Sequence, residues 1–163
     1  MLKKTIFWVV VFLLPITSMA QPDRDLPSRG ERAMEFISKS ANVVVTALSY
    51  LGTPYKWGGN SMEEGVDCSA LVKNVYESAA GVVLPRTSYE QSMATDKISK
   101  SDIKPGDLLF FNTRRRAYSH VAIYIGDGQF IHSPRRGQVV RIESFNSYWI
   151  KRFNGARRVE IDG

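Results

Sequence analysis

Three side chains carry the chemistry of a thiol hydrolase: the only cysteine, Cys68, and the only two histidines, His120 and His132. A thiolate attacks carbonyl carbons, and an imidazole takes the thiol proton and later returns it to the leaving group. Cys68 follows Asp67, a good N-cap residue, at the start of a helix predicted from Cys68 to Ala80. Because the helix dipole and free N–H groups lower the pKa of a thiol there, we expect Cys68 to be a nucleophile.

A structural role is the alternative for each of these residues. A lone cysteine is often a small buried hydrophobe, and a histidine on a strand is often a partly buried or surface polar group. Zinc binding is a second chemical alternative, but one cysteine and two histidines lack an evident fourth ligand or a close-spaced pair. The combination of all three residues favours catalysis.

The hairpin between the two histidines decides whether they meet. A two-residue turn at Asp127-Gly128 places His120 and His132 on opposite faces of the sheet. A three-residue loop over 126–128 pairs Ile125 with Gln129 and makes the histidines diagonal neighbours on one face, roughly 7–8 Å apart at the backbone. Both loops suit the sequence. We choose the three-residue loop because it brings both histidines and the thiol into one site.

In this site Cys68 attacks the substrate, His120 moves the proton, and His132 holds the His120 ring in the productive tautomer. The oxyanion is met by N–H groups at the helix start and by the Tyr55 hydroxyl. The arrangement requires that both histidines share the face of the sheet that carries Cys68.

Hydrophobic periodicity predicts the elements that position these residues. One helix is expected from Ala33 to Leu51, and a brief helix capped by Ser88 runs to Met93. The first helix should bury a single stripe, made of Ile37, Ala41, Val44, Val45, Leu48 and Leu51. Short apolar runs predict strands at Leu108–Phe111, Val121–Ile125, Gln129–His132, Val139–Ile142 and Arg157–Ile161. Helices followed by strands indicate an α+β fold, with N-terminal helices packed on a central antiparallel sheet.

The N-terminus indicates export. Two lysines, an apolar run and a small-residue ending at Ala20 predict a signal peptide over residues 1–20, since the run is short for a membrane anchor. A flexible lead-in is expected over 21–33 and one catalytic domain over 34–163. The cleavage site has no cysteine, so we expect a soluble, monomeric protein in the periplasm or outside the cell, without a lipid anchor or stable membrane insertion. Loss of Lys3 and Lys4 lowers the net charge from +6 to +4, which favours anionic wall polymers, a membrane surface or carboxylate-bearing substrates over nucleic acid as partners.

Several stretches in the right order resemble the NlpC/P60 family of papain-like cell-wall peptidases, and the C-terminal ones are most similar to small murein endopeptidases of the Spr (MepS) type. The matching stretches are 52–59, 66–69, 84–88, 104–108, 119–126, 130–132, 148–149 and 156–159. The resemblance implies a nucleophile at a helix N-terminus and no metal or cofactor. It implies hydrolysis of amide bonds in peptidoglycan stem peptides or cross-links, either D-Ala–diaminopimelate or D-γ-Glu–diaminopimelate, with the first favoured.

The resemblance also assigns residues. It supports Cys68, His120 and His132 as the triad and places Tyr55 near the oxyanion. It implies that the substrate's charged or polar ends contact three further residues, Asp67, Ser69 and Arg86. Small residues replace the family's usual glycines at three positions, Ala70, Ser119 and Ala122, so we expect a slightly altered cleft.

Two questions stay open. The loop Thr113–Ala117 carries Arg114, Arg115 and Arg116 just before His120, and these are either a clamp for substrate carboxylates or, for at least one of them, solvated charges. Two alternative functions also remain: a papain-like amidase or acyltransferase on a non-murein substrate, and a non-catalytic wall-binding module.

Overall fold

The structure, a computed structural model, describes residues 26–161. The predicted signal peptide lies outside the described residues. Within them, no helix combines the length and apolar character needed to cross a membrane. The helices are α1 (Arg29–Ser49), α2 (Cys68–Ala80), α3 (Ser88–Met93) and α4 (Ser147–Ile150), with a 3₁₀ turn at Lys100–Asp102. The strands are β1 (Asn60–Ser61), β2 (Gly65–Val66), β3 (Asp96–Ile98), β4 (Leu108–Phe111), β5 (His120–Gly126), β6 (Gln129–His132), β7 (Arg141–Ser144) and β8 (Phe153–Arg158).

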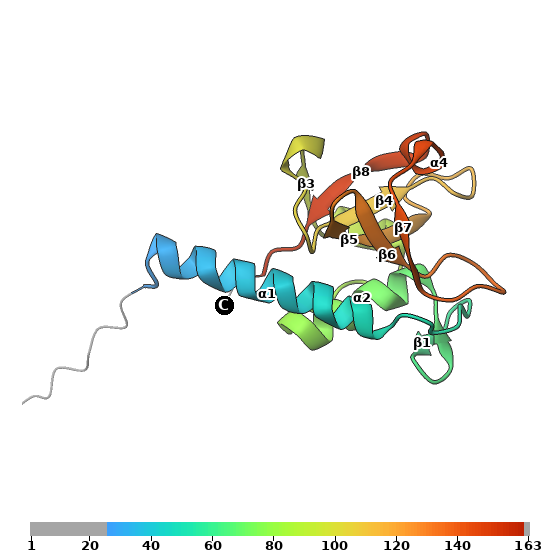
Figure 1. The fold of residues 1–163 in the computed structure, drawn as a ribbon, viewed down its shortest axis with the longest axis horizontal. Helices are drawn as coiled ribbons and strands as arrows, with labels where there is room; N and C mark the ends of the chain where they lie inside the picture. Colours follow the sequence, from blue (N-terminus) through green and yellow to red (C-terminus); the bar gives the residue numbers. More distant parts are fainter. Residues whose placement is uncertain (1–25, 162–163) are drawn as a thin grey trace, which may run out of the picture.

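The larger sheet has the order β3-β8-β4-β5-β6-β7, and all of its paired strands are antiparallel. The strands β1 and β2 form a separate small hairpin just before α2. Figure 1 shows α1 and α2 packed together along one side of the sheet, while α4 lies at its far end. The prediction of an α+β fold with N-terminal helices on an antiparallel sheet is confirmed.

The central strand β5 divides the interior into two clusters. Val121 and Ile123 pack with α1 and α2, whereas Ala122 faces a second cluster that contains Trp149. Side chains alternate along a strand, so His120 points away from the helices as well. Its ring stacks on Trp149, with centroids 5.6 Å apart and planes 24° apart.

The first helix differs from its prediction in both its start and its buried face. It begins at Arg29, inside the segment predicted as a lead-in, because Ser28 and Glu31 form a capping box. The predicted apolar stripe was wrong, since Ile37 and Val45 are 59% and 65% exposed. The buried stripe consists of Ser40, Val43, Ala47 and Tyr50. Apolar residues occur on both sides of this helix, so periodicity alone did not identify the packed one.

Two strands and one cap are also displaced. The strand predicted at 139–142 is β7 at Arg141–Ser144, because Val139 instead forms an isolated bridge with Pro54. The strand predicted at 157–161 is β8 at Phe153–Arg158, where pairing with β4 continues through polar residues and Gly155. Thr87 rather than Ser88 caps α3. Both strands were predicted from runs of apolar residues. Their observed limits are instead set by backbone hydrogen bonds to the neighbouring strands.

The histidine hairpin combines features of both predicted loops. The turn has two residues, Asp127 and Gly128, with φ of 51° and 68°, as in a type I′ turn, so the chosen three-residue loop was wrong. Gly126 pairs with Gln129, and the register then shifts between Tyr124 and Gly126, leaving Ile125 as a bulge. Ile123 therefore pairs with Ile131, and His120 and His132 share one face as predicted.

Candidate active site

The segment that leads to Cys68 is locked by close backbone contacts. Val66 N–H donates to the Pro54 carbonyl at 3.0 Å, and Tyr55 N–H donates to the Gln138 carbonyl at 2.9 Å. Gly65 has φ of 100°, and a Cβ there would lie 2.6 Å from the Pro54 oxygen. Only glycine fits this approach, which fixes the chain just before the helix that carries the thiol.

Asp67 starts that helix and organises the residues around it. Its carboxylate accepts from Ala70 N–H at 2.9 Å and from Gly58 N–H at 3.0 Å. Arg86 forms a two-pronged pair with it, with N–O distances of 2.9 and 2.8 Å, and also donates to Ser69 Oγ at 3.1 Å. Burial opposes ionisation, yet the hydrogen bonds from Arg86, Ala70 and Gly58 outweigh it and lower the pKa of Asp67.

Cys68 lies where the start of α2 meets the start of β5. The backbone N–H of Val121, the residue after His120, hydrogen-bonds to its sulfur and favours the thiolate, as does that of Ser69. Burial is the larger effect and raises the pKa of the Cys68 thiol to about 11. The expectation that the helix start lowers this pKa was therefore wrong, because desolvation in the folded protein exceeds the local effect of the helix N-terminus.

His120 and His132 form a direct pair. Nε2 of His120 lies 2.8 Å from Nδ1 of His132, and both rings are buried. Burial lowers the pKa of His120 well below its ordinary value and lowers that of His132 to about 3, aided in the second case by the charge of Arg141. Both imidazoles are thus neutral at pH 7, and one N–H is shared between them.

The relation of this pair to Cys68 differs from the predicted one. The histidines occupy the face of the sheet opposite to α2, so the expectation of a common face was wrong. The link between them runs through the backbone, because His120 is the first residue of β5 and the N–H of the next residue, Val121, hydrogen-bonds to the Cys68 sulfur. Arg114 lines both the cavity that contains Cys68 and the cavity that contains His120, and its charge favours a lower pKa for both groups.

Arg114 extends across the cleft. Its guanidinium lies 4.3 Å from the centre of the Trp57 ring and donates to the Tyr55 hydroxyl at 3.3 Å. Burial raises the pKa of Tyr55, so its hydroxyl keeps the proton that it can donate. Of the three loop arginines, Arg114 and Arg116 line cavities, whereas Arg115 does not.

Two cavities flank Arg114. One, of about 370 Å³, contains Cys68 together with the predicted substrate contacts. These contacts are Asp67, Ser69 and Arg86. The other, of about 380 Å³, contains His120 and is rich in cationic side chains, namely Arg114, Arg135 and Arg141. The structure thus provides one recess on the thiol side and a basic recess on the histidine side.

Two residues beside the histidines were not predicted as part of the site. Trp149, for which the sequence favoured core packing over a place in the cleft wall, is buried and also stacks on His120. Its indole N–H donates to Glu143 Oε2 at 2.5 Å. Glu143 approaches His132 from β7, and in the sequence it lies one residue beyond the strand predicted at 139–142.

Comparisons with known proteins place this chain in one family. The NlpC/P60 family matches residues 52–158. The murein DD-endopeptidase MepH of Escherichia coli K12 is 41% identical over 128 residues, which are 76% of this chain and 47% of MepH. The murein DD-endopeptidase/LD-carboxypeptidase MepS of the same strain is 35% identical over 144 residues, 88% of this chain and 73% of MepS. The chain thus spans less than half the length of MepH.

A solved structure gives the same picture of the fold. The NlpC/P60 domain of the peptidoglycan hydrolase SagA superposes with a TM-score of 0.65 and 38% sequence identity. The match covers 74% of this chain and 98% of that domain. The fold and the family resemblance expected from the sequence motifs are therefore confirmed.

Proposed function

Because the chain belongs to the NlpC/P60 family, we propose that it is a cysteine peptidase that hydrolyses amide bonds in peptidoglycan stem peptides or cross-links. The observation that carries this proposal is the His120–His132 pair at the start of β5, next to the N–H that binds the Cys68 sulfur. A thiol, a buried neutral imidazole and a second imidazole that orients the first are the parts of a thiol-dependent acyl transfer.

In the proposed reaction His120 Nδ1 accepts the thiol proton while Cys68 Sγ bonds to the carbonyl carbon. The tetrahedral intermediate collapses when His120 passes this proton to the leaving amine, so the C–N bond breaks and a thioester remains. Water, activated by His120, then attacks the thioester, releases the carboxylic acid product and restores the thiol. The raised pKa of Cys68 and lowered pKa of His120 mean that the proton moves during attack rather than beforehand.

The surroundings supply the other parts of the site. N–H groups in the first turn of α2 and the Tyr55 hydroxyl are the donors for the oxyanion. Asp67, Ser69 and Arg86 line the recess beside the thiol and contact a charged or polar end of the substrate. On the histidine side, Arg114 and its neighbours face the leaving group, so carboxylates of diaminopimelate fit that recess.

The names of the relatives favour one bond. MepH and MepS are called DD-endopeptidases, so we propose the D-Ala–diaminopimelate cross-link ahead of the D-γ-Glu–diaminopimelate bond.

We place the enzyme in the periplasm or outside the cell as a monomer, after cleavage near Ala20. Edman sequencing of the mature protein from osmotic-shock fluid tests that cleavage, and a retained leader would contradict it.

The decisive experiment incubates purified sacculi with the protein and identifies released muropeptides by mass spectrometry. We expect cross-linked dimers to be converted into monomers by the wild type and not by Cys68→Ala. Release of fragments cut after D-glutamate would assign the other bond. No release by the wild type, or equal release by Cys68→Ala, would contradict the peptidase proposal and leave wall binding or another amide substrate.

A further inference from the structure

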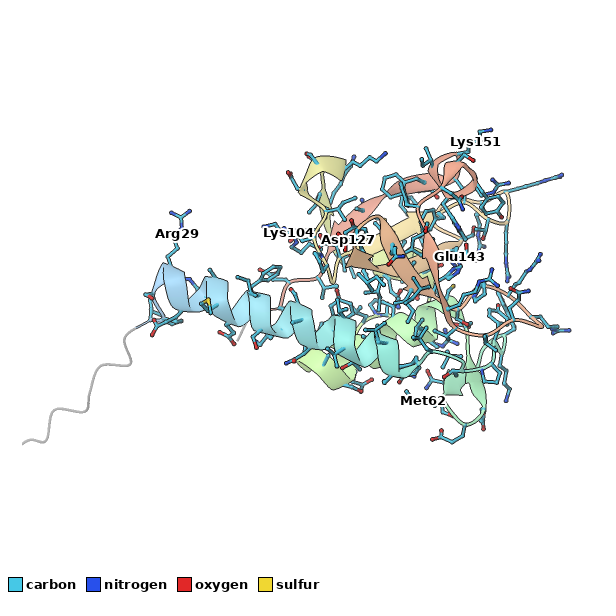
Figure 2. All side chains as sticks on the ribbon, in the orientation of Figure 1. Arg29, Met62, Lys104, Asp127, Glu143 and Lys151 are labelled. Atoms are coloured by element: carbon cyan, nitrogen blue, oxygen red, sulfur yellow. The ribbon has the colours of Figure 1, made fainter. Side chains whose placement is uncertain are left out.

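Glu143 lies behind His132, on the side away from His120. In the β6–β7 ladder His132 pairs with Arg141 and Phe130 pairs with Glu143, so Glu143 is a diagonal neighbour of His132 on the same face. Its Oε1 lies 3.5 Å from Nε2 of His132. Figure 2 labels Glu143, which lies on β7.

The facing nitrogen has no other partner. Nε2 of His132 is fully buried and makes no hydrogen bond to any residue in the described part of the chain. A buried polar nitrogen without a partner is unfavourable, whereas an N–H donated to a carboxylate is a strong, charge-assisted hydrogen bond. Catalytic hydrogen bonds in ligand-free proteins are often long and shorten when substrate binds. The Glu143 carboxylate, 3.5 Å away, is therefore the acceptor within reach of this nitrogen.

The carboxylate of Glu143 is itself held from two sides. Trp149 Nε1 donates to its Oε2 at 2.5 Å, and Arg141 Nε donates to its Oε1 at 2.7 Å. The same Trp149 ring stacks on His120. These contacts fix the carboxylate in place, so its position is determined before any substrate arrives.

The proton arrangement follows from this contact. A neutral imidazole carries one N–H, so the single hydrogen bond between His120 and His132 has two possible directions. If His132 donates from Nδ1, then His120 must accept at Nε2, and its own proton sits on Nδ1, where it cannot receive one from Cys68. If His132 donates from Nε2 instead, His120 donates from Nε2 and keeps Nδ1 free.

We propose that Glu143 is a positioning residue that accepts the Nε2–H of His132 and thereby selects the tautomer in which His120 Nδ1 is free to act as a base. The consequence for catalysis rests on the proposed peptidase function, whereas the choice of tautomer does not. Glu143 touches neither substrate nor thiol in this role and acts only through His132. The lowered pKa of His132, which keeps this ring neutral, is consistent with a donor rather than an imidazolium.

Nuclear magnetic resonance tests the tautomers directly. Long-range ¹⁵N–¹H correlation spectra of the ¹⁵N-labelled mature protein at pH 7 distinguish Nε2–H from Nδ1–H in each histidine. In the wild type both His120 and His132 should be the neutral tautomer that carries its proton on Nε2. An Nδ1–H form of either ring in the wild type would overturn the proposal, and this readout needs no variant to fold.

Variants then test the cause. Glu143→Ala should lose the Nε2–H preference of His132, while Glu143→Gln, whose amide oxygen can still accept, should retain most of it. Glu77→Gln is the matched control, because Glu77 pairs only with Lys73 in an exposed i,i+4 contact on α2. Unchanged tautomers in a folded Glu143→Ala protein would overturn the proposal.

Kinetics complete the test. Glu143→Ala should lower kcat on muropeptides by about 10–100-fold, the range for second partners of reactive groups, and leave KM within about twofold. Glu143→Gln should recover most of the loss. A changed tautomer with unchanged kcat would overturn the catalytic consequence. If the wild type is inactive on every murein substrate, the peptidase proposal fails while the tautomer result still decides the role of Glu143.

Discussion

Nε2 of His120 lies 2.8 Å from Nδ1 of His132, with the two rings nearly perpendicular and both buried. A buried pair of this kind is stable when both rings are neutral and one N–H lies between them, because a positive charge on either ring would be desolvated. The pair therefore links the stability of the fold to pH as well as supplying the base of the proposed reaction.

Acid should destabilise the protein over a pH range that is set by the pKa values of His120 and His132. Their pKa values are lower in the folded protein than the ordinary value near 6.5, so the unfolded chain binds more protons below that pH. The stabilisation is complete above about pH 6.5 and is lost as the pH falls toward the folded values. We expect the free energy of unfolding to fall by up to about 1.4 kcal/mol per pH unit for each histidine. Urea unfolding at pH 6.5, 5.5 and 5.0 measures this slope.

His132→Gln supplies the control for this slope. It removes one titrating ring and retains a side chain that can hydrogen-bond to His120. The slope should fall to about half of the wild-type value in the same pH range. A wild-type free energy that is flat between pH 6.5 and 5.0, or a slope that His132→Gln does not change, would show that the histidines titrate normally.

Cys68 should react slowly with alkylating reagents at neutral pH. Burial raises the pKa of its thiol to about 11, and only the thiolate reacts. The rate of iodoacetamide labelling should therefore keep rising beyond pH 9 in the folded protein. In denaturant the same thiol should titrate near its ordinary pKa of about 8.5. A plateau reached already at pH 7 would instead indicate a preformed thiolate–imidazolium pair. Mass spectrometry of timed samples provides both profiles.

Local sequence signals predicted the helix of the nucleophile well. Asp67 caps its start and Gly81, in the left-handed conformation, ends it, so both limits of α2 follow from adjacent residues. The Asp127-Gly128 turn was one of two loops that suited the sequence, and it was not the one chosen. The bulge at Ile125 has no such signal, because it depends on how β5 packs against its neighbours. The predicted common face of the histidines was right, although the loop chosen to justify it was wrong.

The electrostatics of the site depended on tertiary contacts. The helix start at Cys68 is visible in the sequence, but the desolvation that dominates the pKa of its thiol arises only when the folded chain buries it. Glu143 was not predicted, because its contact with His132 depends on the register of two strands joined by an eight-residue loop at 133–140. Sequence motifs thus identified the reactive groups, while burial and strand register determined their protonation.

Arg86 should contribute to stability through Asp67. Arg86→Met removes both prongs of the ion pair and leaves a largely buried carboxylate with the N–H groups of Gly58 and Ala70 and the Ser69 hydroxyl as donors. Since Arg86 is itself partly exposed, we expect a loss of about 1–2 kcal/mol in the free energy of unfolding. Arg86→Lys should not restore it, because lysine lacks the planar fork. Lys73→Met, which breaks an exposed pair on the same helix, should change the free energy by less than about 0.5 kcal/mol. Equal effects of Arg86→Met and Lys73→Met in urea unfolding would contradict this prediction.

Arg114 should determine how the substrate binds. Its guanidinium lies on Trp57, donates to Tyr55 and borders both cavities, so a carboxylate entering on the histidine side meets it directly. Arg114→Gln should raise KM for carboxylate-bearing muropeptides about tenfold, equivalent to about 1.4 kcal/mol, with a smaller effect on kcat.

Arg115→Gln is the matched control for this prediction. Arg115 is exposed in the same loop and lines neither cavity, so the loss of one charge there should leave KM within about twofold. Since both variants change the net charge equally, a difference between them separates a local contact from long-range attraction of the substrate. Equal increases in KM would assign the effect to net charge alone. A lower KM for Arg114→Gln would mean that this side chain covers the cleft and must move aside before substrate binds.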